Sequence, residues 1–181
     1  MQIDEQTILH FWFTELTTKE WWQKSAQLDQ RIARKFSEIH DQAHSNLLGA
    51  WRNTAHGRLA EIIVLDQFSR NIYRDDARAF ASDPLALELT QEAVHLGMDA
   101  ELTTTEKSFL YMPLMHSEEL ESHQQAVSLF DQPGLESSLN FELKHKAIID
   151  RFGRYPHRNG ILGRNSTLEE VEFLKGPGSS F

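Results

Sequence analysis

The 181-residue chain contains no cysteine, so neither a disulfide framework nor a thiolate metal site is available to it. It has no apolar run of membrane-spanning length, and the longest run we find is IIVL at residues 62–65. It also lacks stretches in which β-branched and polar residues alternate, the pattern typical of half-buried strands. These absences argue against a disulfide-rich secreted domain, a membrane-spanning protein and a mainly β fold.

Positive charge is scarce as well. The chain has 18 Lys and Arg against 27 Asp and Glu, a formal net charge of -9. The average field around such a protein repels phosphate, so nucleic acid is an unlikely partner and an anionic membrane surface is excluded. The first residues, MQIDEQ, do not have the basic, apolar and small-residue order of a signal peptide. We therefore expect a cytoplasmic protein without a membrane partner.

Cofactor and metal motifs are missing too. The sequence contains no G-x-G-x-x-G, no phosphate-loop lysine motif and no G-x-S-x-G elbow, so we expect no cofactor. The group His116, Glu118, Glu119 and His123 comes nearest to a metal site, because Glu119 and His123 are four positions apart. A metal needs three or four convergent ligands, and this spacing does not offer such a set. We predict no metal.

Helical periodicity, in contrast, covers nearly the whole chain. Apolar residues recur every three or four positions, and capping residues precede most of the runs. The expected helices cover residues 4–13, 17–46, 54–71, 84–96, 103–113, 117–130, 139–152 and 167–174. The links between them are mostly short, which favours antiparallel neighbours. The sequence therefore predicts a single all-α domain over residues 1–181, built of antiparallel helical hairpins.

Three helix ends carry explicit signals. Asp83 is the expected N-cap of the fourth helix, and Pro113 should end or kink the fifth. Ser166 and Glu169 have the spacing of a capping box ahead of the last helix. Two histidines on the long second helix, His40 and His44, are expected to be solvated.

Eight of the eleven arginines lie in two short windows, and six of these eight are among the candidate binding residues. Residues 151–167, RFGRYPHRNGILGRNST, hold Arg151, Arg154, Arg158 and Arg164 and no acid. The guanidinium fork binds two oxygens at once, so such a cluster suits a carboxylate or a phosphate. Gly153 should end the preceding helix, and a loop of about a dozen residues follows, long enough to be functional if it is ordered. The same arginines could instead satisfy loop carbonyls.

The other window lies within residues 58–78. Asp66 and Arg70 are four positions apart and predict an ordinary surface pair on a helix. Arg70 and Arg74 share this spacing, and two like charges together call for an anion or an acidic side chain between them. Because NIYRDD is turn-like, Arg74 could also belong to an exposed charged turn. His116, just before Ser117, is a candidate for a residue that lines a cleft.

Several of these stretches resemble a bacterial family known as domain of unknown function 924. The resemblance is carried by FWF, WW, LDQFSRNIYRDDARAFASDPLAL, YMPLMHSE, RFGRYPHRNGILGRNSTLEEVEFL and PGSSF, in this order over nearly the whole chain. It implies an all-helical fold similar to a tetratricopeptide-like α-α superhelix, and it implies no activity. The family motifs fall on Leu65, Asp66, Gln67, Phe68, Arg70, Asn71, His116, Ser117, Glu118, Arg151, Phe152, Gly153, Arg154, Pro156, His157, Arg158 and Asn159. Ser69 departs from the pattern, because the family has proline there, and so does His10, where an acid is usual.

These observations leave three functional readings. The first is a binding protein with an arginine- and histidine-rich cleft for an anionic or polar ligand, either a peptide carboxylate or a small metabolite. Its candidate residues are Asp66, Arg70, Asn71, Arg74, His116, Glu118, Arg151, Arg154, His157, Arg158, Asn159 and Arg164. The second is an enzyme that uses His116 or His157 as acid and base, with arginines for electrostatic stabilisation. The third is a purely structural polar core with its arginines fully paired. The oligomeric state is not predicted.

Overall fold

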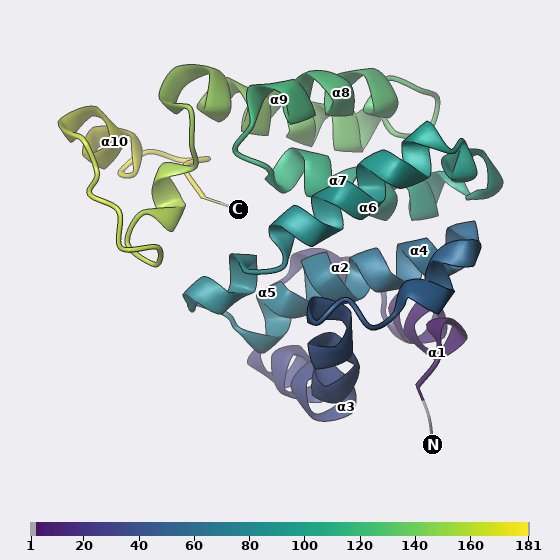
Figure 1. Cartoon of the computed structure of the whole chain (residues 1–181). Helices are drawn as coiled ribbons and strands as arrows, with labels where there is room; N and C mark the ends of the chain where they lie inside the picture. Colours follow the sequence, from purple (N-terminus) through teal and green to yellow (C-terminus); the bar gives the residue numbers. More distant parts are fainter. Residues whose placement is uncertain (1–2, 181) are drawn as a thin grey trace.

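The structure, a computed structural model, describes residues 3–180, and these residues form helices and loops without a strand (Figure 1). The α-helices are α1 (Glu5–His10), α2 (Thr18–Trp22), α3 (Ala26–His44), α4 (Ala55–Ile62), α5 (Ser69–Ile72), α6 (Asp83–His95), α7 (Thr104–His116), α8 (Leu120–Phe130), α9 (Glu136–Phe152) and α10 (Leu168–Phe173). Short 3-10 turns occur at Gly49–Asn53, Ala77–Phe80, Met98–Glu101 and Pro156–Arg158, and π-helical turns at Phe11–Glu15 and Ile63–Phe68. The all-α prediction is confirmed. Among the described residues, no helix is long and apolar enough to cross a membrane.

Local capping signals place several helix starts correctly. The Asp4 carboxylate accepts the N–H of Thr7 at the start of α1. Capping boxes join Thr17 to Glu20 at α2 and Thr103 to Glu106 at α7. These caps work because a helix start leaves N–H groups without intrahelical acceptors.

Other boundaries differ from the prediction. The helix expected over 17–46 is interrupted at residues 23–25, and Ser25 caps a separate helix, α3, through the N–H of Leu28. The N-cap of α6 is Ser82, so Asp83 is the first helical residue and its carboxylate is free to bind elsewhere. The last capping box uses Thr167 and Glu170, one position beyond the predicted pair.

Pro113 does not end α7, which runs on to His116. A proline inside a helix removes one backbone hydrogen bond and costs about 3 kcal/mol in an unsupported helix. Here residues 108–115 are all buried, and the packing of this segment against its neighbours offsets that loss.

One large hydrophobic core holds the helices from α1 to α8 together. Aromatic rings form much of it, with Phe36 stacked on Phe68 at 4.9 Å and Phe11 against the edge of both. α6 packs on α7, α7 on α8 and α8 on α9, as expected for successive helical hairpins. The C-terminal segment, yellow in Figure 1, lies beside the end of α9 around a smaller core of Ile148, Ile149 and Tyr155.

The prediction that His40 is solvated is wrong. Its side chain is buried, and Nε2 lies 2.7 Å from the Ser69 hydroxyl, which in turn donates to the Leu65 carbonyl. His44 lies one turn later, with Nδ1 2.9 Å from the hydroxyl of Ser82. α3 therefore directs His40 toward α5, where Ser69 partners Nε2 and the buried Nδ1 has no hydrogen-bond partner among the described residues. His44 is exposed, as predicted, beside the start of α6.

Candidate functional site

The segment between α9 and α10 is ordered and packs against the C-terminal end of α7. Gly153 ends α9 in the left-handed conformation, with φ of 66°, which glycine adopts without steric cost. Tyr155 is fully buried, and its hydroxyl donates to the Met115 carbonyl over 2.5 Å. Its backbone N–H donates to the carboxylate of Glu118. The predicted ordered loop is therefore present, and α7 anchors it.

Two of the loop arginines are neutralised by acids from other segments. Arg154 donates to both carboxylate oxygens of the buried Glu170, at 2.7 and 2.8 Å. Arg164 makes the same two-pronged contact with Glu118, at 2.6 and 2.9 Å. Although burial opposes ionisation of Glu118, the hydrogen bond from Arg164 holds the pKa of this carboxyl below its ordinary value. The carboxylates that neutralise these two arginines therefore lie outside residues 151–167: Glu118 precedes α8, and Glu170 belongs to α10.

Two candidate residues of the 58–78 window are likewise bound by an acid from another segment. Arg74 donates to Asp29 through Nε and Nη2, at 2.6 and 2.7 Å, and Asn71 donates to the same carboxylate at 2.8 Å. Arg70 and Arg74 thus meet different acids and do not share one between them: Arg74 meets Asp29 of α3, whereas Arg70 meets Asp66 and Asp83. Arg74 and Asn71 serve to join α3 to α5.

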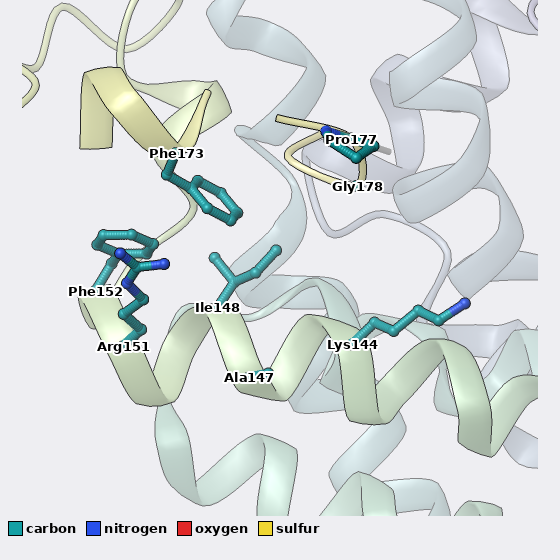
Figure 2. A pocket seen from close by; sticks show the side chains of 8 residues that line it. All are labelled: Lys144, Ala147, Ile148, Arg151, Phe152, Phe173, Pro177 and Gly178. Carbon is teal, nitrogen blue, oxygen red and sulfur yellow. The ribbon is translucent and has the colours of Figure 1, made fainter. Parts of the chain in front are cut away.

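Arg151 lies away from the other candidates. It pairs with Glu169 at 2.8 Å on the surface and borders a groove of about 480 Å³ between α9 and the C-terminal segment. The groove is mainly apolar: Figure 2 shows Phe152 and Phe173 close to Arg151, with Lys144 farther along α9. Of the predicted site residues, Arg151 alone is among those that line this groove.

Asp66 occupies the centre of a buried polar cluster at the end of α7. It lies in the π-helical turn Ile63–Phe68, where an extra residue in the turn changes the direction of the side chains; such turns are frequent at functional sites. The predicted surface pair is wrong, because Asp66 is 1% exposed. Nη1 of Arg70 lies 3.1 Å from Oδ1 of Asp66. Arg70 also donates to both oxygens of Asp83, through Nη1 at 2.9 Å and Nη2 at 3.0 Å. Burial acts to raise the pKa of Asp66, but the charge of Arg70 and the hydrogen bond from His116 hold it well below its ordinary value.

His116 completes the contact with Asp66. It is the last residue of α7, and its Nδ1 lies 2.7 Å from Oδ1 of Asp66. Because the carboxylate is ionised and can only accept, Nδ1 carries the hydrogen and the lone pair is on Nε2. No group among residues 3–180 hydrogen-bonds to Nε2, and the side chain keeps 17% of its surface exposed. Burial and the charge of Arg70 lower the pKa of His116, so the ring is neutral at pH 7.

Arg158 lies next to this pair, and its side chain makes a single hydrogen bond. It is 7% exposed, and its guanidinium lies 4.6 Å from the ring centres of both Phe80 and Tyr155. Nη2 donates to the His116 carbonyl at 2.9 Å, whereas Nη1 is 3.7 Å from Asp83. Nε is buried without a hydrogen-bond partner among the described residues. Burial and the charge of Arg70 lower the pKa of Arg158.

The remaining candidates, His157 and Asn159, flank this arginine. His157 is half-buried, and burial together with the charge of Arg158 lowers its pKa to about 4. Asn159 is buried and donates to the Ser166 hydroxyl and to Glu170, so it stabilises the loop. Sequence reasoning missed Asp83 as a site residue, since a separation of 13 positions from Arg70 has no helical period.

A second acid–histidine pair is buried between α8 and α9. His123 Nε2 lies 2.9 Å from the Ser117 carbonyl, which can only accept, so Nε2 carries a hydrogen. Nδ1 of the same ring lies 2.7 Å from Glu142 Oε1, and Oε2 of this carboxyl has no partner among the described residues. Burial raises the pKa of Glu142, and a protonated carboxyl can donate to Nδ1. The described residues contain no group of three or more His, Cys, Asp or Glu able to hold a metal ion.

The fold and the cluster define an all-helical protein with a buried aspartate, histidine and two arginines between α7 and its neighbours. The profile of a family described as "Bacterial protein of unknown function (DUF924)" matches residues 8–178, and the chain belongs to this family. A solved structure of a protein of unknown function, ATU0120 from Agrobacterium tumefaciens, is similar, with 35% sequence identity and a TM-score of 0.90 over 95% of this chain and 97% of that chain. No curated protein matches.

Proposed function

We propose that this protein binds a small molecule through an anionic group, a carboxylate or a phosphate, at Arg158 and His116. The observation that carries the proposal is the environment of Arg158. A buried donor without an acceptor costs about 1–3 kcal/mol, and more for a charged group. Nε of Arg158 has no acceptor among residues 3–180, and both oxygens of the nearest carboxylate, Asp83, already accept from Arg70. An anion from outside the chain supplies the missing acceptors.

The other arginines fit the structural reading instead. Arg74, Arg154 and Arg164 each meet a carboxylate in a two-pronged contact, and Arg151 pairs on the surface. The binding site therefore contracts from twelve candidate residues to the group around Asp66, Arg70, His116, His157 and Arg158. A peptide carboxylate and a small metabolite both offer the required group. The cytoplasmic location and the tetratricopeptide-like superhelix remain predictions.

A thermal-shift comparison of two arginine variants tests this proposal. Phosphate or acetate should raise the melting temperature of the wild type above that in chloride at equal ionic strength, because a ligand that binds only the native state stabilises it. Arg158→Gln should abolish this increment. Arg154→Gln is the matched control on the same loop: it should lower the melting temperature but keep the increment, since Arg154 already has Glu170.

The structural reading predicts a different pattern. In that case neither anion stabilises the wild type beyond chloride, and Arg158→Gln changes only the starting melting temperature. An increment that survives in Arg158→Gln would place the anion elsewhere on the protein and contradict the assignment.

A further inference from the structure

We propose that His116 is a general base that activates water for the hydrolysis of an ester whose carboxylate group is held by Arg158. This inference rests on the proposed function, because Arg158 must first hold the anionic end of the substrate. It adds a reaction and a substrate class to the binding site.

The geometry of the Asp66–His116 pair supports the role of base. A buried carboxylate at 2.7 Å fixes the ring in the tautomer with hydrogen on Nδ1. Nε2 then presents its lone pair on the side where the ring reaches solvent, without a protein partner among residues 3–180. A carboxylate that orients a histidine in this way also stabilises the imidazolium that forms when Nε2 takes a proton.

The position of Arg158 places a substrate beside that lone pair. Its Nη2 is bound to the carbonyl of His116 itself, so the guanidinium and the imidazole belong to one rigid corner. Contacts with the rings of Phe80 and Tyr155, each with its centre 4.6 Å away, also hold the guanidinium in place. An anion on Nε or Nη1 is therefore held at the same end of α7 as the base.

The charge of the cluster favours a carboxylate over a phosphate dianion. Arg70 and Arg158 together carry two positive charges, and Asp66 and Asp83 carry two negative ones. A ligand with a single negative charge disturbs this balance least, since each further unpaired charge in a buried site is costly. The charges thus favour a substrate with one free carboxylate, and the ester is the bond that we propose His116 to hydrolyse.

Nε2 of His116 accepts a proton from water while the water oxygen forms a bond to the ester carbonyl carbon. The bond from this carbon to the alkoxy oxygen then breaks, and the leaving oxygen takes the proton back from Nε2. The products are a carboxylic acid and an alcohol, and no oxidant or reductant is needed. His116 is the catalytic residue, and Asp66 is a positioning residue.

Two chromogenic esters test the proposal with the full chain. The wild type should hydrolyse 4-nitrophenyl hemisuccinate, which has a free carboxylate, with a higher kcat/KM than the uncharged 4-nitrophenyl acetate. His116→Gln should lower the rate on the charged ester by about 10²- to 10⁴-fold, the usual contribution of a general base. Arg158→Gln should remove the preference for the charged ester. His10→Gln, on an exposed histidine, is the control for nonspecific imidazole catalysis and should retain the wild-type rate.

Nitrogen-15 NMR of histidine-labelled protein gives a readout that does not depend on a variant's folding. His116 should show hydrogen on Nδ1 and an unprotonated Nε2 at pH 7. Asp66→Asn should shift the ring toward a mixture of tautomers and lower the rate on the charged ester, which a merely structural aspartate would not do. Hydrogen on Nε2 in the wild type would overturn the proposal.

The outcomes separate this inference from the proposed function. If anions stabilise the protein through Arg158 but His116→Gln hydrolyses the charged ester as fast as the wild type, the site binds and does not catalyse. If the anion increment is absent as well, the proposed function fails with it.

Discussion

Arg154 and Arg158 lie four positions apart on one loop and meet different surroundings. Arg154 finds both oxygens of Glu170, so its charge is balanced within the chain. Arg158 has one backbone carbonyl as its hydrogen-bond partner and two aromatic rings, and the nearest carboxylate is 3.7 Å away. The two residues cannot be told apart from the composition of the loop, because composition gives the number of charges and not the hydrogen-bond acceptors around each guanidinium. The distinction comes only from the segments that the fold brings to each guanidinium.

The Glu142–His123 pair makes the stability of the protein depend on pH. The folded-state pKa of Glu142 is raised above the ordinary value of 4.5, so the native state binds a proton that the unfolded chain has already lost above this pH. The stabilising contribution is complete below pH 4.5 and decreases as pH rises toward the folded-state pKa. Glu142→Gln should remove this part of the slope, since the amide N–H still donates to Nδ1 of His123.

Urea unfolding of both proteins between pH 4.5 and pH 8 measures the difference in slope. The variant should gain stability relative to the wild type as pH rises. If both proteins follow the same pH dependence over this range, Glu142 is ionised in the folded state and the hydrogen assignment to the pair is wrong. Lys175, which pairs with Glu172 on the surface, offers a control: Lys175→Gln should leave the slope from Glu142 in place.

At the scale of helices, local signals placed those ends that depend on neighbouring residues in the sequence. Asp4, the Thr103–Glu106 box and Gly153 were predictable because a cap needs only its own turn. The continuation of α7 past Pro113 was not, because it depends on burial against distant helices. The loop residues of the candidate site were identified from charge. Their partners, such as Asp83, were not, since contacts between elements leave no period in the sequence.

The close approach of α4 to the preceding 3-10 turn gives a prediction for Gly57. A Cβ at this position would lie 2.0 Å from the Trp51 carbonyl oxygen, which is far inside van der Waals contact with a backbone atom. Gly57→Ala should therefore lower the free energy of unfolding by about 3 kcal/mol, at the upper end of overpacking effects. Urea unfolding measures the change. Gly49→Ala, where an added Cβ meets nothing within 4 Å, should stay within about 0.5 kcal/mol of the wild type.

At the scale of the whole molecule, the described residues contain two cores of unequal size. The large core extends from α1 to α8, and the small one holds the end of α9 and the segment that follows. The loop of residues 153–166 joins them through Glu118, which binds Arg164 and the N–H of Tyr155. This arrangement gives the C-terminal part fewer buried contacts, and regions of that kind open first.

Glu118→Gln tests this order of opening by hydrogen exchange. The variant loses one charge of the two-pronged contact with Arg164, so amides of residues 153–175 should exchange faster. Protection in α3, α4 and α7 should stay at the wild-type level, because these helices belong to the large core. Faster exchange throughout the chain would show that the two cores unfold together. Glu121→Gln, on an exposed residue of α8, is the control and should not change the pattern.

The π-helical turn at Ile63–Phe68 also has a consequence for how the sequence tolerates insertions and deletions. Such a turn holds one residue more than an α-helical turn, and each residue advances an α-helix by about 100°. Deleting a single residue between Asp66 and Arg70 would leave a regular helix but would rotate Arg70, Asn71 and Arg74 away from their carboxylates together. Chains that share this site must therefore keep the number of residues here, even where the identity of a residue changes.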